Sequence, residues 1–196
     1  MRHVLPLVLV LWATTAAAGE RPTRADLQRA LALHERSVVK VKGSKGAGPG
    51  VIVGTEGQVL TAVRHVELEA AQVEFERQLL PTTVLLADAA LKVAVVAAPA
   101  GTYPAVPVQV AAASPVGQWL IGVEPGPGRR QTPASALARE APAPFIDVDL
   151  ILPPGSPLFD TRGRLVAVSV QRQGRGCRAL PLEVVRQRLA PRVASP

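Results

Sequence analysis

The chain has 196 residues, a formal net charge of +7, 19 Pro, 16 Gly and only 3% aromatic residues. This length is enough for one domain, or for two small packed ones, with a substantial core. Abundant Pro and Gly favour short strands between turns over long helices. The basic residues are dispersed and lack the interleaved aromatic side chains of a nucleic-acid platform, so we expect no nucleic-acid partner.

Residues 1–18 have the pattern of a secretory signal peptide. Arg2 and His3 precede an apolar run from Val4 to Trp12, and small residues lead to a cleavage site after Ala18. The run is too short to span a bilayer comfortably and no later stretch is long enough, so we expect no transmembrane helix after cleavage. The sequence therefore predicts an exported protein, periplasmic or secreted. An uncleaved N-terminal anchor is the alternative.

Cys177 is the only cysteine, so we expect no internal disulfide in the exported protein. It opens the largely apolar run from Cys177 to Leu182. That setting favours a small buried core residue over a reactive thiol.

Residues 19–36 predict an amphipathic helix, in which leucines recur among charged residues and Thr23 and Asp26 have capping-box spacing. Apolar and alternating runs then predict strands, interrupted by a Pro/Gly/Ala-rich connection at 98–107, and a closing helix follows at about 182–189. This pattern alone predicts an all-β chain of two sandwiches or barrels. The expected strands fall within 37–43, 51–53, 59–60, 73–75, 84–86, 93–96, 145–152 and 165–170.

Several short patches, in order along the chain, carry a resemblance to a known family: SVVKV, LTAVRHV, ADAAL, GQWLIG, SPLFD and CRALPLEVVRQRL. The ordered set resembles the trypsin-like serine proteases, especially the bacterial HtrA group, from about Leu27 to Leu189. The resemblance implies two packed six-stranded antiparallel β-barrels with short N- and C-terminal helices and a ligand cleft between the barrels. The first barrel would occupy 37–103, and the second, with the C-terminal helix, 104–196. We expect no PDZ domain, which HtrA proteins carry next.

Two members of the family's catalytic triad can be matched within the first barrel. His65 takes the histidine position, with one extra residue before it that a bulge or a shifted turn would absorb. The position of the orienting aspartate falls on Lys92. An ammonium group cannot accept the imidazole N–H and disfavours formation of an imidazolium. Asp88, four residues earlier, would substitute only in a rearranged loop.

The third triad position lies in the loop that begins LPPGSPLFD at Leu152. Counting back from Pro157 places the nucleophile on Pro154, whose side chain has no nucleophilic atom. In a second alignment the loop is shortened, and Ser156 merely lies near the lost position. Both alignments remove the nucleophile. Pro153 and Pro154 also supply no N–H groups for an oxyanion hole.

These matches predict an exported pseudoprotease rather than an enzyme, with a degenerate triad at His65, Lys92 and Pro154 and with no cofactor or metal. Its partner would be a protein or an extended peptide in the inter-barrel cleft, held by strand addition. The alternative is an active serine endopeptidase with a rearranged site that uses Ser156 and His65, with Asp88 or with no acid. A third interpretation, an anion-binding surface formed by the dispersed arginines, ranks last.

Overall fold

The computed structural model describes residues 19–44, 46–67, 71–109, 114–126 and 130–190. The predicted signal peptide lies outside them. The chain begins with helix α1, Arg24–Ser37. Thr23 Oγ1 accepts the Asp26 N–H at 3.3 Å and the Asp26 carboxylate accepts the Thr23 N–H at 2.9 Å, so the capping box expected from the sequence starts this helix. In the part of the chain that is described, no helix is long and apolar enough to cross a membrane.

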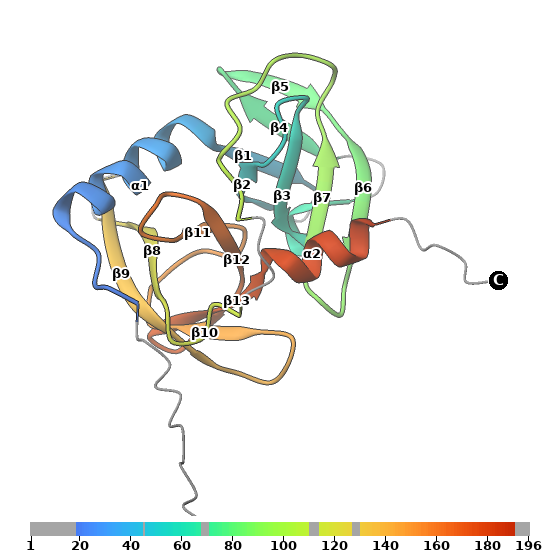
Figure 1. The fold of residues 1–196 in the computed structure, drawn as a ribbon. Helices are drawn as coiled ribbons and strands as arrows, with labels where there is room; N and C mark the ends of the chain where they lie inside the picture. Colours follow the sequence, from blue (N-terminus) through green and yellow to red (C-terminus); the bar gives the residue numbers. More distant parts are fainter. Residues whose placement is uncertain (1–18, 45, 68–70, 110–113, 127–129, 191–196) are drawn as a thin grey trace, which may run out of the picture.

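The first half of the chain forms one antiparallel sheet of seven strands, in the order β5-β4-β1-β2-β3-β7-β6. A single 3-10 turn, η1 (Val63–His65), follows the third strand. The sheet occupies one side of the molecule (Figure 1). Its strands are β1 Val38–Gly43, β2 Gly46–Ile52, β3 Gln58–Ala62, β4 Gln72–Phe75, β5 Gln78–Pro81, β6 Thr83–Asp88 and β7 Val93–Ala97.

This sheet corrects the prediction of two closed six-stranded barrels, because the first unit is open. Its edge strands β5 and β6 follow each other in the chain but do not pair with each other. Pro81 has no N–H that could pair with a neighbouring strand. The Thr82 N–H donates a hydrogen bond to the Ala71 carbonyl at 3.2 Å. The chain therefore leaves one edge at Pro81 and starts the other edge at Thr83.

The second half forms a closed six-stranded barrel, in the order β10-β13-β12-β11-β8-β9, as the resemblance implied. Helix α2, Leu182–Leu189, follows the last strand and reaches back to the first sheet, where Arg188 Nε lies 3.6 Å from an Asp88 carboxylate oxygen (Figure 1). The barrel strands are β8 Trp119–Pro125, β9 Gln131–Glu140, β10 Ile146–Val148, β11 Pro157–Phe159, β12 Leu165–Gln173 and β13 Gly176–Pro181.

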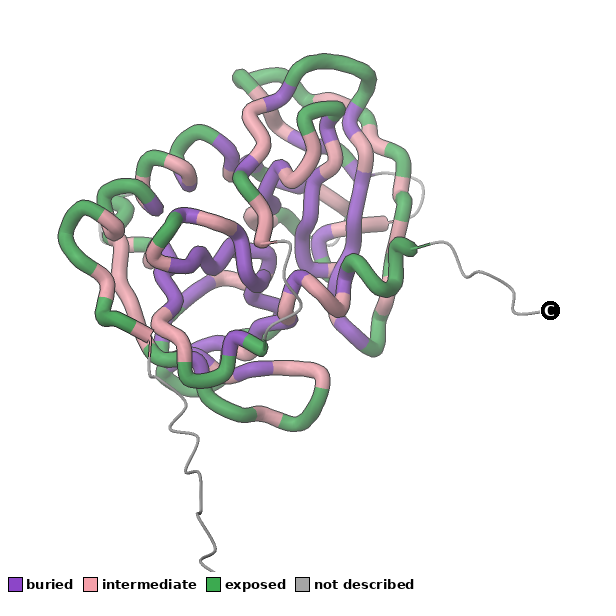
Figure 2. The backbone as a smooth tube through the Cα atoms, in the orientation of Figure 1, coloured by how far each residue is buried: buried purple, intermediate pink, exposed green. Residues whose placement is uncertain are grey.

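The sheet and the barrel share a hydrophobic core. One cluster of buried side chains joins Val51 and Leu60 of the sheet to Ile121, Phe159 and Leu165 of the barrel. Buried segments line the inner surfaces of both units (Figure 2). Full burial of a side chain of this size contributes about 1.5–3 kcal/mol. The shared core therefore fixes the two units against each other and positions the segments that meet between them.

Candidate functional site between the sheet and the barrel

His65 ends η1, the 3-10 turn that follows β3. The side chain is buried, and its Nε2 atom lies 3.0 Å from the carbonyl oxygen of Pro154 in the barrel. A carbonyl can only accept, so Nε2 carries the hydrogen. Burial lowers the pKa of His65 below its ordinary value of 6.5; the Pro154 carbonyl opposes this effect and the Arg64 charge adds to it.

Lys92 stands just before β7 with a left-handed backbone, φ 59°. Its carbonyl accepts the Val63 N–H at 3.0 Å, which ties it to η1. Its ammonium donates to the side-chain carbonyl of Gln171 in β12. The residue at the expected position of the orienting carboxylate therefore connects the sheet to the barrel.

Asp88 ends β6 and has its own partners. One carboxylate oxygen accepts the Leu91 N–H at 2.9 Å, and the other lies 3.6 Å from Arg188 Nε in α2. Among the hydrogen bonds of the described residues, none joins Asp88 or Lys92 to His65. Asp88 thus holds the turn that leads into Lys92.

The loop at 153–156 packs tightly between the two units. The Gly155 N–H donates to the Ser169 carbonyl at 2.6 Å, and the Ser169 N–H donates to the Ser156 carbonyl at 2.8 Å. Gly155 has φ 95°, and a Cβ there would lie 2.0 Å from the Pro49 carbonyl oxygen. Only glycine fits this close approach without a shift of the backbone.

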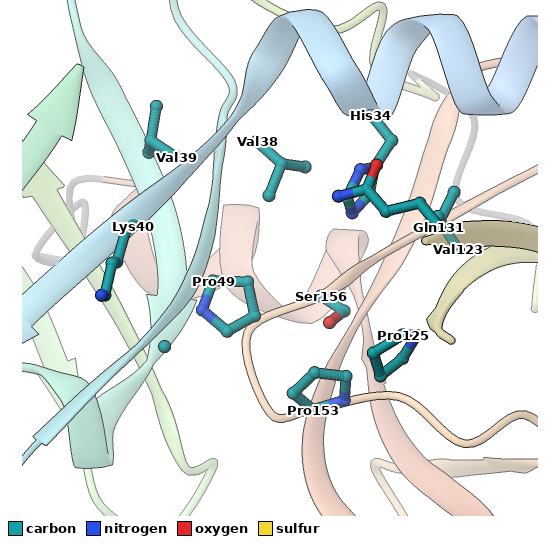
Figure 3. A pocket seen from close by; sticks show the side chains of 11 residues that line it. His34, Val38, Val39, Lys40, Pro49, Val123, Pro125, Gln131, Pro153 and Ser156 are labelled. Atoms are coloured by element: carbon teal, nitrogen blue, oxygen red, sulfur yellow. The ribbon is translucent and has the colours of Figure 1, made fainter. Parts of the chain in front are cut away.

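Ser156 is 3% exposed and faces a cavity of about 330 Å³, hereafter the Ser156 cavity (Figure 3). The ring of His34 lies on its upper side, next to the Gln131 amide. Burial lowers the pKa of His34, and the Gln131 hydrogen bond opposes that effect. Within the described residues, His34 Nδ1 has no hydrogen-bond partner. The cavity is lined by His34, Val38, Val39, Lys40, Gly48, Pro49, Val123, Pro125, Gln131, Pro153 and Ser156.

His65 does not line this cavity. Its ring packs against Gly48, which itself lines the cavity, and a Cβ at Gly48 would lie 2.1 Å from His65 Nε2. Of the predicted site residues, the structure thus brings His65 and Pro154 into contact and directs Ser156 toward the Ser156 cavity. No hydrogen bond between Ser156 and His65 is found among the described residues.

A second cavity, of about 290 Å³, lies on the other side of the loop, between η1 and β12. We refer to it as the cleft. Two of its lining residues, Lys92 and Pro154, are candidate site residues from the sequence. Arg64 and Arg172 are not, although Arg64 directly precedes His65. The cleft is lined by Val63, Arg64, Lys92, Pro154, Val170, Gln171 and Arg172.

The C-terminal part of β12 borders the cleft and is paired on one side only. Gln171, Arg172 and Gln173 pair with β13, whereas β11 reaches β12 only as far as Val168. A two-residue turn joins Gln173 to Gly176, so these two residues form both backbone hydrogen bonds with each other. The next pair, Arg172 and Cys177, forms none between its two members. The Arg172 N–H and C=O therefore point away from β13, toward the open edge.

Cys177 is buried in the barrel core, as predicted, and burial raises its pKa to about 11. In the described ranges, no group of three or more His, Cys, Asp and Glu side chains is placed to hold a metal ion.

Comparison with solved structures shows the same fold in serine proteases. The crystal structure of the serine endoprotease from Yersinia pestis matches with a TM-score of 0.70 at 19% identity, covering 86% of this chain and 66% of that one. The crystal structure of the Rv3671c protease, inactive form, matches with a TM-score of 0.68 at 21% identity, covering 90% of this chain and 99% of that one. This chain thus spans just under two thirds of the Yersinia structure. No protein-family model and no curated protein sequence matches it.

These matches show that the chain has the trypsin-like serine protease fold. They also correct one expectation, namely that the chain is not an enzyme. Both matched structures are of proteases, so the fold is one that carries proteolysis, and the proline and lysine substitutions read from the sequence do not establish a loss of activity. The assignment of individual triad positions stays a prediction.

Proposed function

We propose that this chain is an exported protein of the trypsin-like fold that binds an extended peptide or protein segment in the cleft. The observation that supports this most directly is the free edge of β12 at Arg172, which borders a cavity between the sheet and the barrel. Export rests on the signal-peptide pattern of residues 1–18.

Binding by strand addition follows from the geometry of this edge. An extended segment alongside β12 accepts the Arg172 N–H and donates to the Arg172 C=O, which continues the ladder by one strand. Its side chains then point alternately toward and away from the cleft. The backbone bonds supply affinity, and the cleft supplies selectivity.

The test uses an array of immobilised decapeptides of varied sequence, followed by titration of the best binder. Arg172→Pro removes the outward N–H while keeping the ladder to β13, because the N–H that is lost faces the open edge. Arg172→Gln removes the same charge and keeps the N–H, so it is the matched control. We expect Arg172→Pro to bind at least tenfold more weakly than Arg172→Gln. Equal affinities of these two variants would contradict the proposal.

Hydrolysis of the bound segment is a second candidate function. The fold is shared with serine proteases, and His65 contacts the same short loop that carries Ser156. For Ser156 to be activated, His65 Nε2 must leave the Pro154 carbonyl and accept the serine proton. Mass spectrometry of peptides incubated with the protein decides the matter. New termini that vanish in Ser156→Ala support hydrolysis, and intact peptides exclude it for those sequences.

A further inference from the structure

We infer that the cleft selects extended segments that carry Asp or Glu side chains beside the residue paired with Arg172. The inference rests on the proposed function and specifies its ligand class. It is carried by the charges that line the cleft, which come from three segments far apart in the sequence.

The side chains at the cleft are of one sign. Arg64, Lys92 and Arg172 line it, and no carboxylate of the described residues does. Some cations elsewhere in the molecule are neutralised locally; for example, Lys42 lies 2.7 Å from Glu74 and Arg178 lies 3.0 Å from Asp147. Among the ion pairs of the described residues, none involves the three cleft cations.

Lys92 is held in place for such a contact. Its ammonium donates one hydrogen to Gln171 of β12, and an ammonium has three to donate. Its backbone is left-handed at φ 59°, a conformation that costs a non-glycine residue about 1–2 kcal/mol and that clusters at functional sites. The charge is therefore fixed at the junction of the sheet and the barrel, with hydrogens left for an anion.

The proposed strand places acidic side chains next to these cations. Residues two apart on an extended segment share one face and are separated by about 7 Å. A segment fixed at the Arg172 backbone thus presents every second side chain to the cleft, between Arg64 and Lys92 of the sheet and the Arg172 side chain of the barrel. A carboxylate there is attracted by all three charges, and a basic residue is repelled.

The test compares three matched decapeptides built on the best array binder, carrying Glu, Gln or Lys at the two cleft-facing positions. We expect the Glu peptide to bind about tenfold more tightly than the Gln peptide at low salt, and this preference to shrink at about 0.5 M salt as the charges are screened. Arg64→Gln, Lys92→Gln and Arg172→Gln should each weaken binding of the Glu peptide about threefold, the size of one exposed ion pair. They should leave the Gln peptide unaffected.

Arg77→Gln is the control, because Arg77 is an exposed residue at the β4–β5 turn, outside the cleft lining. Equal binding of the Glu and Gln peptides would overturn this inference and leave the proposed function standing. Failure of every peptide to bind would overturn both. A heparin oligosaccharide whose binding is weakened by the three cleft substitutions, while the Glu peptide keeps its affinity, would assign the charges to a different anion and would also overturn the inference.

Discussion

The imidazole of His65, in the sheet, donates from Nε2 to the carbonyl oxygen of Pro154, in the barrel, at 3.0 Å. This hydrogen bond joins the two units next to the cleft, because Pro154 also lines the cleft. The same ring is buried and packs on Gly48, where a Cβ would lie 2.1 Å from His65 Nε2.

Removing this ring should destabilise the fold. His65→Ala deletes a buried side chain and leaves the Pro154 carbonyl without its donor, which together cost about 3 kcal/mol. Chemical denaturation of the purified protein measures the loss. Arg64→Gln, at the neighbouring position, should change the free energy of unfolding by less than about 0.5 kcal/mol. A loss of less than about 0.5 kcal/mol for His65→Ala as well would show that the His65 contact contributes nothing.

The buried histidines should make stability depend on pH. His34 and His65 both have a pKa below the ordinary value of 6.5, chiefly through burial. As the pH falls below about 6.5, the unfolded chain takes up protons before the folded chain does, so stability is full above that pH and is lost below it. Thermal unfolding at about pH 7.5 and about pH 5.5 should show the fall. In the double variant His34→Phe, His65→Phe, most of this pH dependence of stability should disappear. A fall in stability as large as in the unchanged protein would assign the pH dependence to other groups.

Replacing Gly155 by alanine should destabilise the protein far more than replacing Gly117, another glycine with a positive φ. Gly117 has φ 78°, and a Cβ added there would meet no atom within 4 Å, so Gly117→Ala carries only the cost of the left-handed backbone, about 1 kcal/mol. Gly155→Ala adds a clash at 2.0 Å with the Pro49 carbonyl oxygen and should cost about 3 kcal/mol or more. Denaturant midpoints compare the two variants. Similar losses would contradict the packing described for the loop at 153–156.

The thiol of Cys177 should be inert in the folded protein. It is buried, and its pKa of about 11 leaves almost no thiolate near neutral pH. An aromatic disulfide that releases a coloured thiolate on reaction with a free thiol should therefore react slowly with the native protein and rapidly after denaturation. Rapid reaction of the native protein would place the thiol at the surface.

Local signals in the sequence were sufficient for some features of the fold. Thr23 and Asp26 predicted the helix start, and the apolar run at Cys177 predicted its burial, because each depends on neighbours in the chain. The open first sheet was not predicted. Its cause is the break at Pro81 and Thr82, where strand-like residues continue on both sides but the backbone hydrogen bonds go to different partners.

The basic lining of the cleft was not predicted from the sequence. Pattern matching singled out Lys92 and Pro154 because the resemblance aligns them with positions of a known motif, an assignment that stays a prediction. Arg64 and Arg172 match no motif, and only the packing of η1 against the end of β12 brings them to one cavity with Lys92. Charges that converge through tertiary structure leave no periodicity in the sequence.

Amide hydrogen exchange of β12, with and without the best decapeptide, tests peptide binding in the cleft most directly. We expect the Arg172 N–H, which faces the open edge, to be protected at least tenfold on binding, whereas the Gln173 N–H, already bonded to β13, should change little. Protection confined to residues around the Ser156 cavity, with the Arg172 amide unchanged, would contradict it.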